Sequence, residues 1–160
     1  MAIQPKSTVV PFVVHGSGTG VAQHVEVPDS PHAFDTDAYP AFGGKDEAPS
    51  PLFYALASLS SCNQVTAALV AKDLGIELGA FSFQVRGDLD TAVLVGGEEG
   101  NANFDKVTVR ATIESDATAE QFATLEAETE RRCPVSQLFK RSGLAFDVEW
   151  TQVPLPVAAA

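Results

Sequence analysis

The N-terminal third of the chain alternates short apolar runs with turn-forming residues. Three such runs are separated by clusters of Gly and Ser or of Pro, Asp and Ser, which is the pattern of short strands joined by turns. The expected strands cover residues 8–15, 21–27 and 32–35. Residues 39–51 are then rich in Pro, Gly and charge, so we expect a loop there that leads into a helix.

A second β region follows the middle of the chain. Apolar residues take every second position in residues 80–90 and again in residues 106–114. The turn-rich stretch 96–103 lies between the two runs, so we expect them to pair in a meander. A last strand is expected over residues 145–153.

A long helix is predicted between the two β regions. Ser50 followed by Pro51 suits a helix start, because the hydroxyl accepts an orphan amide hydrogen and proline lacks the donor that would be unpaired there. Gly75 suits a left-handed cap, which places the last helical residue at about Leu74. Residues 50–71 carry no charge, but polar side chains near their middle argue against a bilayer span. We therefore expect a helix buried in protein on most of its circumference.

Two further helices are predicted near the end of the chain. Thr118 and Gln121 form a capping-box pattern ahead of an amphipathic stretch. Cys133 and Pro134 interrupt this helix, because the residue before a proline avoids helical angles. A short helix is expected from there toward Gly143. The order of strands, helix, strands and helices predicts an α+β fold.

The size and charge of the chain limit its organisation and its partners. With 160 residues, 45% of them hydrophobic, it can bury one substantial core, so we expect a single domain over residues 1–160 with a flexible tail at 154–160. The net charge is −11 and the basic residues are scattered, so neither nucleic acid nor a membrane is an expected partner. The N-terminus shows no secretory signal, so a cytoplasmic location is expected.

Cys62 and Cys133 are the two cysteines of the chain. In a reducing compartment such a pair is more often catalytic, redox-sensing or metal-binding than a structural disulfide, although two unrelated buried thiols also fit. Burial in the uncharged helix would raise the pKa of Cys62 and make it inert. Cys133 is instead expected to cap a short helix directly after Arg131 and Arg132, where the dipole and the cations favour a thiolate. The separation of the two cysteines in the sequence does not show whether folding places their sulfurs within the distance that a disulfide requires.

Other candidate sites are weak. His15, His24 and His32 have no spacing that pairs ligands on one turn or hairpin, so no metal is expected. The glycines of residues 96–100 lie between strands and open no helix, so a phosphate cradle is not expected either. We expect no cofactor.

Several short motifs, taken in order, resemble the OsmC/Ohr family of proteins. They are HAFD at 32–35, GGKD at 43–46, PSP at 49–51, the small-residue helix 52–62 that ends at Cys62, GDLD at 87–90 and CPV at 133–135. Each motif is weak alone, but their order and spacing make residues 31–142 similar to this family.

The resemblance implies both a fold and an activity. The implied fold is an intertwined homodimer in which antiparallel sheets wrap around central helices, with active sites at the dimer interface. The implied activity is a thiol-dependent peroxidase for organic hydroperoxides. Cys62 would attack the peroxide and become a sulfenic acid, Cys133 would condense with it to a disulfide, and a small or protein dithiol would reduce that disulfide.

The sequence departs from the family pattern at two supporting positions. Peroxidatic members also use an arginine from an N-terminal loop and a glutamate shortly before the peroxidatic cysteine. Here the first arginine is Arg86, and the glutamate region reads PLF at 51–53. Possible replacements, to which no role is assigned, are Lys6, Glu47, Arg131 and Arg132. The rival hypothesis is therefore a catalytically lapsed OsmC-like dimer that binds an apolar small molecule. We favour the enzyme because both cysteines are kept.

Overall fold

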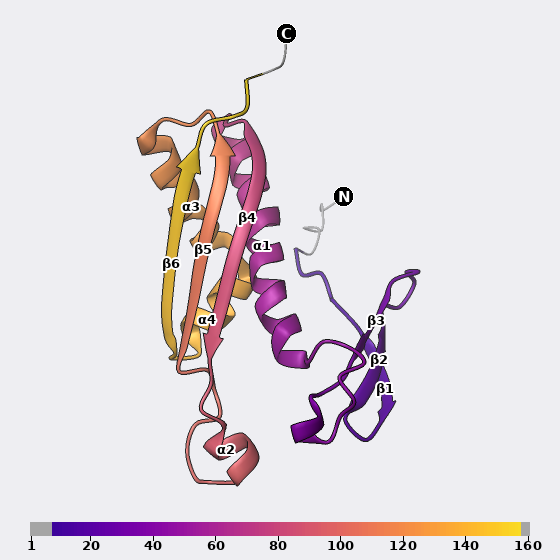
Figure 1. Cartoon of the computed structure of the whole chain (residues 1–160). Helices are drawn as coiled ribbons and strands as arrows, with labels where there is room; N and C mark the ends of the chain where they lie inside the picture. The colour runs from indigo at the N-terminus through magenta and orange to yellow at the C-terminus, as the bar shows by residue number, and fades with distance from the viewer. Residues whose placement is uncertain (1–7, 158–160) are drawn as a thin grey trace, which may run out of the picture. The chain divides into compact units, whose positions relative to one another are not determined.

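The computed structural model describes residues 8–157 (Figure 1). They form two compact units that divide between Phe53 and Tyr54. Of the expected tail, residues 154–157 form no regular structure, and residues 158–160 lie outside the described part. The expectation of a single domain over the whole chain stays a prediction.

The first unit is built on an antiparallel sheet in the order β1-β2-β3. Its strands are β1 (His15–Thr19), β2 (Ala22–Glu26) and β3 (Ala33–Thr36), and a short 3-10 helix, η1 (Pro40–Phe42), follows. Gly20 has a φ of 67° in the two-residue connection between β1 and β2, where a tight hairpin requires a left-handed residue. The second and third predicted strands are confirmed to within two residues.

The first strand lies further along the chain than predicted. The apolar run 9–14, which Pro11 interrupts, is exposed and forms no strand. The strand is instead the Gly- and Ser-rich segment that follows it. The pairing of β1 with β2 across the hairpin sets the bounds of β1, because Thr19 lies opposite Ala22 and His15 lies opposite Glu26.

The carboxylate of Asp37 organises the loop after β3. It accepts hydrogen bonds from the backbone N–H groups of Ala38, Lys45 and Glu47 at 2.7, 3.0 and 3.1 Å. These bonds, that from Glu47 foremost, lower the pKa of Asp37 below its ordinary value. A Cβ atom at Gly44 would collide with the Ala38 carbonyl, so this loop requires glycine there.

Helix α1 (Pro51–Leu74) begins and ends where predicted, and Gly75 follows it in the left-handed conformation with a φ of 69°. The prediction that the helix is buried on most of its circumference is not met within one chain. Val65 and Leu69 are 62% and 53% exposed. The buried side consists of Leu59, Asn63, Thr66, Ala67, Val70 and Ala71. None of the described helices combines the length and the apolar character that a membrane span requires.

The second unit contains a sheet in the order β4-β5-β6. Strands β4 (Leu78–Asp88) and β5 (Lys106–Ser115) are antiparallel, as predicted, and β6 (Ala145–Val153) has the predicted bounds. However, β5 and β6 are parallel, so this sheet is mixed rather than wholly antiparallel. A parallel pair needs a long crossover, and the two helices between β5 and β6 supply it.

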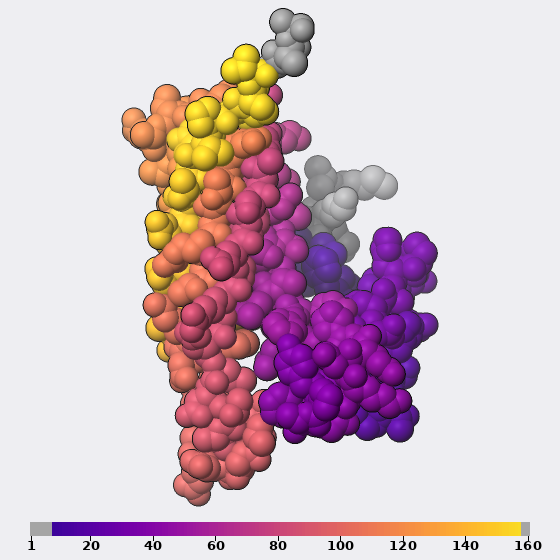
Figure 2. All heavy atoms as spheres, viewed as in Figure 1, coloured from indigo at the N-terminus to yellow at the C-terminus, as the bar shows by residue number. Residues whose placement is uncertain are grey.

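The connection between β4 and β5 contains a short helix that the sequence reasoning missed. This helix, α2 (Thr91–Gly96), begins after Asp90, whose carboxylate accepts a hydrogen bond from the Ala92 N–H at 2.9 Å. It ends at Gly97, which is left-handed. Figures 1 and 2 show this connection extending past the end of the sheet.

The crossover helices follow the prediction closely. Helix α3 (Ala119–Arg132) has the expected capping box, because Thr118 and Gln121 each accept the other's backbone N–H. Helix α4 (Pro134–Arg141) follows at once. Cys133 is therefore both the last cap of α3 and the first cap of α4.

Helices α1, α3 and α4 lie on one face of the second sheet (Figure 1), and two apolar clusters join them to it. The first, here called the distal cluster, consists of Ala67, Val70, Ala71, Ile76, Ala111, Ile113, Phe122, Leu125 and Trp150. The second, here called the thiol-side cluster, consists of Leu59, Val107 and Val109, with Val135, Phe139 and Phe146 among the partly buried residues packed against it. The α+β fold class is thereby confirmed.

Candidate functional site

The two cysteines, which are distant in the sequence, meet in the second unit. Cys62 lies in the middle of α1, and Cys133 caps the start of α4. Their thiols lie close enough that each shifts the pKa of the other. Both cysteines are free thiols in this structure. The fold therefore brings together the pair of site residues that the sequence singled out.

Cys133 lies in a buried site that is rich in hydrogen-bond donors. Its side chain is 0% exposed. Its sulfur accepts a hydrogen bond from the backbone N–H of Ser136 at 3.4 Å, and further bonds from the Ser136 hydroxyl and the Val135 N–H. Pro134 has no N–H to offer, so the first free N–H groups of α4 are those that reach the sulfur.

A buried asparagine supports this arrangement from the opposite helix. The Nδ2 group of Asn63, the residue after Cys62, donates to the Oγ of Ser136 at 3.0 Å and to the Leu59 carbonyl at 2.8 Å. Asn63 is 3% exposed and Ser136 is 1% exposed. Because buried polar groups are costly unless they are paired, these bonds fix α1 against the start of α4.

Cys62 has fewer donors than Cys133 and is only partly buried. Burial raises its pKa above the ordinary value. The Val135 N–H and the Thr66 hydroxyl oppose this rise, whereas the neighbouring Cys133 sulfur adds to it. The surroundings of Cys62 therefore favour its protonated form.

The pKa of Cys133 shifts in the opposite direction from that of Cys62. Burial alone would raise its pKa, but the hydrogen bonds from Ser136, Cys62 and Val135 outweigh that cost and lower the pKa below the ordinary value. The start of α4 adds the positive end of a helix dipole. The surroundings of Cys133 therefore favour its thiolate form.

The predicted cationic neighbours of Cys133 are engaged elsewhere. Arg131 contacts Glu128 at 2.7 Å, and Arg132 contacts Asp73 at 2.7 Å. Within the described residues of the second unit, the interactions that shift the two thiol pKa values come from uncharged donors and from the thiols themselves. Arg86 bonds Asp88 on β4, and Lys6 lies outside the described residues. Backbone and hydroxyl donors thus take the place that a cation was expected to fill.

Three side chains of this site escaped the sequence reasoning, namely Asn63, Thr66 and Ser136. Two signals could have found them. A polar residue next to Cys62 in an otherwise uncharged, buried helix demands a partner. Ser136 stands three positions after the capping residue, which is where a helix's first turn returns to its cap.

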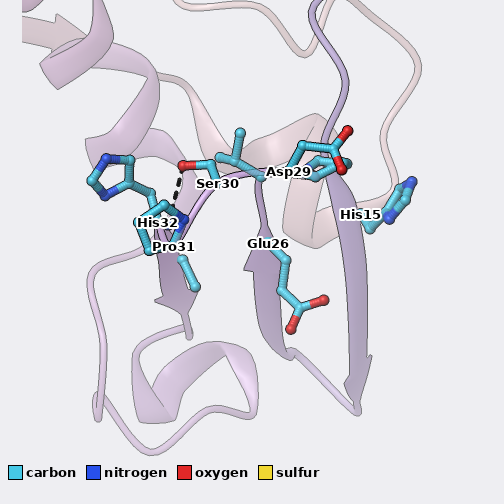
Figure 3. Close-up of a pocket in the computed structure, with 9 residues that line it drawn as sticks. His15, Glu26, Asp29, Ser30, Pro31 and His32 are labelled. Atoms are coloured by element: carbon cyan, nitrogen blue, oxygen red, sulfur yellow. Dashed lines mark hydrogen bonds between the residues drawn. The ribbon is translucent and has the colours of Figure 1, made fainter.

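The first unit contains a separate cavity of about 280 Å³, which residues of the β1 start and the β2–β3 turn line. Figure 3 shows the rings of His15 and His32 on opposite sides of it. His24 instead pairs with Asp35 at 2.7 Å, and this hydrogen bond raises the pKa of His24. Among residues 8–157 no three His, Cys, Asp or Glu side chains gather as a metal site would require.

Comparisons with known proteins agree with the observed fold. The family described as OsmC-like protein matches residues 44–149. The OsmC like protein from Mycoplasma pneumoniae is 19% identical, with a TM-score of 0.75 over 90% of this chain and 98% of that chain. An organic hydroperoxide resistance protein from Elizabethkingia anophelis is 20% identical, with a TM-score of 0.71 over 92% and 100%. The organic hydroperoxide resistance protein OhrB of Bacillus subtilis is 22% identical, with a TM-score of 0.60 over 89% and 98%. No curated protein matches the chain.

Proposed function

Because the chain belongs to the OsmC-like protein family, we propose that it is a thiol-dependent peroxidase that reduces organic hydroperoxides with Cys62 and Cys133. One observation carries this proposal. Two sulfurs from distant parts of the sequence contact each other at the start of a helix, amid donors that stabilise a thiolate. Two buried thiols with only a packing role would need no such donors.

The reaction proceeds in three steps. The Cys62 sulfur attacks the outer oxygen of the peroxide bond, which releases an alcohol and leaves a sulfenic acid on Cys62. The Cys133 sulfur then attacks the Cys62 sulfur, which forms a disulfide and releases water. A dithiol reductant, small or carried on a protein, exchanges with that disulfide and restores both thiols. No resident cofactor takes part in this scheme.

The difference in exposure supports the assignment of the two roles. Cys133 is fully buried, whereas Cys62 is partly exposed. A peroxide or a reductant from solution therefore reaches the Cys62 sulfur first. Cys133 is shielded from solvent beside Cys62, which suits a resolving cysteine.

The uncovered side of α1 supports a homodimer with the site at its interface. Cys62, Val65 and Leu69 follow one another at helical spacing, so their side chains lie on one side of the helix. An apolar helix side of this kind is unstable in water unless a second surface covers it. A second copy would cover it and give an organic peroxide an apolar approach to Cys62. Leu69→Asp is then expected to yield monomers in analytical ultracentrifugation, whereas the exposed Leu94→Asp in α2 leaves the dimer intact.

The deciding experiment measures the consumption of cumene hydroperoxide with a dithiol reductant. We expect turnover by the wild type, none by Cys62→Ser, and a single oxidation without turnover by Cys133→Ser. Mass spectrometry of the oxidised wild type should show a Cys62–Cys133 disulfide. The matched control is Ser58→Ala, because the Ser58 hydroxyl bonds only its own helix, at the Ala55 carbonyl.

The rival hypothesis predicts a different result. A catalytically lapsed dimer that binds an apolar small molecule would match the Cys62→Ser blank across a series of peroxides and reductants. It would still bind apolar fluorescent probes in a manner that Leu69→Asp abolishes. That combination would refute the peroxidase proposal. The cytoplasmic location belongs to the same proposal, because a reducing compartment supplies the dithiol.

A further inference from the structure

The start of α4 contains a chain of three buried, hydrogen-bonded groups that ends on the Cys133 sulfur. Asn63 donates to the Ser136 oxygen at 3.0 Å, and Ser136 donates to Cys133 through its backbone N–H at 3.4 Å and through its hydroxyl. All three side chains are at most 3% exposed. Water therefore has no access through which it could replace any member of the chain.

The direction of this chain follows from the donors that each group has. An amide nitrogen can only donate, so Asn63 fixes the Ser136 oxygen as an acceptor. A serine hydroxyl has one hydrogen, and with its oxygen occupied by Asn63 that hydrogen points to the sulfur. Ser136 thus presents two hydrogens to Cys133. A negatively charged sulfur accepts such bonds more strongly than a neutral thiol does.

We propose that Ser136, held by Asn63, is a positioning residue that keeps the negative charge of the reduced thiol pair on Cys133, and that Cys133 is the base that takes the proton of Cys62. The first part of the proposal, the location of the charge, does not rest on the proposed peroxidase function. The base step rests on the proposed peroxidase function. The proposal explains how the chain can work with neither an N-terminal arginine nor a glutamate ahead of Cys62.

The steps balance as follows. The reduced pair begins as a Cys62 thiol and a Cys133 thiolate. As the Cys62 sulfur attacks the outer peroxide oxygen, its proton passes to Cys133, and the O–O bond breaks to give a Cys62 sulfenic acid and an alkoxide. Cys133 returns the proton to the alkoxide, which leaves as the alcohol. The Cys133 thiolate then displaces hydroxide from the sulfenic acid, and the two sulfurs, oxidised together by the peroxide, form a disulfide.

Few other titratable groups bear on the pair. Cys62 is the titratable partner of Cys133 within the described part of the second unit, and it comes from α1. The two cations that precede Cys133 on α3 bond carboxylates instead, Arg131 with Glu128 and Arg132 with Asp73. The charge on Cys133 is therefore controlled by Ser136 more than by any salt bridge.

The test is a pH titration of both thiols by NMR, in reduced protein labelled with ¹³C at the cysteine Cβ. The chain has two cysteines, and Cys62→Ser and Cys133→Ser assign the two signals. We expect Cys133 to lose its proton at lower pH than Cys62. In Ser136→Ala the Cys133 midpoint should rise by about one pH unit, so that its thiolate fraction below the midpoint falls about tenfold.

The opposite end of α4 supplies a matched control. There Asn103 Nδ2 donates to Ser142 Oγ at 3.0 Å, which is the same kind of pair, but it is exposed and contacts neither thiol. Ser142→Ala and Asn103→Ala should leave both midpoints unchanged. Ser136→Thr keeps a hydroxyl and should keep the wild-type midpoint, which a merely structural role would not predict.

A double-mutant cycle tests the role of Asn63. If Asn63 acts through Ser136, Asn63→Ala raises the Cys133 midpoint in the wild type and adds nothing in the Ser136→Ala background. Asn63→Ala also tests the same hydrogen bond from the other side should Ser136→Ala not fold. Additive shifts would overturn the positioning role of Asn63.

Two outcomes overturn the proposal, and a third separates it from the proposed function. If Cys62 titrates first, or if Ser136→Ala moves the Cys133 midpoint no further than Ser142→Ala does, the charge is not where we place it. The pH at which cumene hydroperoxide oxidises Cys62 half-maximally should move upward with the Cys133 midpoint in Ser136→Ala. If the titration behaves as expected but no peroxide oxidises Cys62, the peroxidase function and the base step both fail, while the location of the charge stands.

Discussion

The two apolar clusters beneath the second sheet have the same helix–sheet architecture but different contents. The distal cluster is wholly apolar, and α1, α3 and the second half of β5 meet in it. The thiol-side cluster has fewer fully buried apolar residues and lies beside buried polar groups, namely Asn63, Ser136 and Cys133. This difference teaches that one end of the layer holds most of the buried apolar packing, whereas the other end holds buried hydrogen bonds around the Cys133 thiol.

The largest expected effect is in the distal cluster. Leu125 is 0% exposed on α3, so Leu125→Ala removes buried methyl groups and leaves a cavity. We expect a loss of about 2–5 kcal/mol in the free energy of unfolding, measured by urea at constant protein concentration, with unchanged thiol titration. Leu94→Ala, at an exposed position of α2, is the control and should change stability by less than about 0.5 kcal/mol. A shifted Cys133 midpoint in Leu125→Ala would show that the two ends are coupled.

At the thiol side, the expected cost of a substitution comes from lost hydrogen bonds. Asn63→Ala leaves the buried Ser136 oxygen without its donor, and we expect a loss of about 1–3 kcal/mol in the free energy of unfolding. The same urea measurement on Asn103→Ala, whose partner Ser142 can turn to water, should show a smaller loss. Equal losses in the two variants would contradict the view that burial makes the Asn63 pair important.

A third substitution distinguishes a useful polar group from an idle one at the thiol side. Thr129 on α3 is fully buried, and its hydroxyl has no hydrogen-bond partner among residues 8–157. Thr129→Val removes this hydroxyl and keeps the shape, so we expect stability to be unchanged or to rise by up to about 1 kcal/mol. A loss in thermal unfolding would mean that the hydroxyl has a partner after all. Thr66→Val is the contrasting variant, because the Thr66 hydroxyl bonds Cys62.

The smallest expected effect is a pH dependence beside the distal cluster. Burial raises the pKa of Glu126, against a hydrogen bond from the backbone N–H of Trp150. Because the folded state holds this proton more tightly than the unfolded state does, the resulting stability is present below the ordinary value of 4.5 and is lost as pH rises through the folded pKa. Glu126→Gln should therefore raise the melting temperature slightly at pH 7 and hardly at all at pH 4. Glu99→Gln, on an exposed loop, should show no such difference between the two pH values.

The sequence predicted those elements that carry their own local signals. Pro51 and Gly75 bound α1, the Thr118 capping box starts α3, and the predicted bounds of β6 agree with the structure. Features that depend on a partner were misplaced, and α2 was missed although Asp90 and Gly97 cap it locally. The position of β1 is set by its hairpin with β2, and the parallel alignment of β6 is set by the crossover, so neither can be read from the residues of the strand itself.

The candidate site was predictable in its sulfurs but not in their surroundings. Cys133 could be recognised as a cap because Pro134 follows it directly. The hydrogen bond between Asn63 and Ser136 joins residues far apart in the sequence, and only the packing of α4 on α1 reveals it. The flanking arginines misled the prediction, since their carboxylate partners lie on other turns or helices.

The parallel alignment of β5 and β6 has a consequence for protein synthesis. Residue Cys133 lies inside the crossover, and α4 packs through Phe139 against Phe146 of β6, a strand that follows every other element in the sequence. The packing of α4 against the sheet is therefore completed only after β6 has been synthesised and has docked. Cys62 is synthesised well before Cys133, and the two thiols come together only after the crossover helices α3 and α4 have formed.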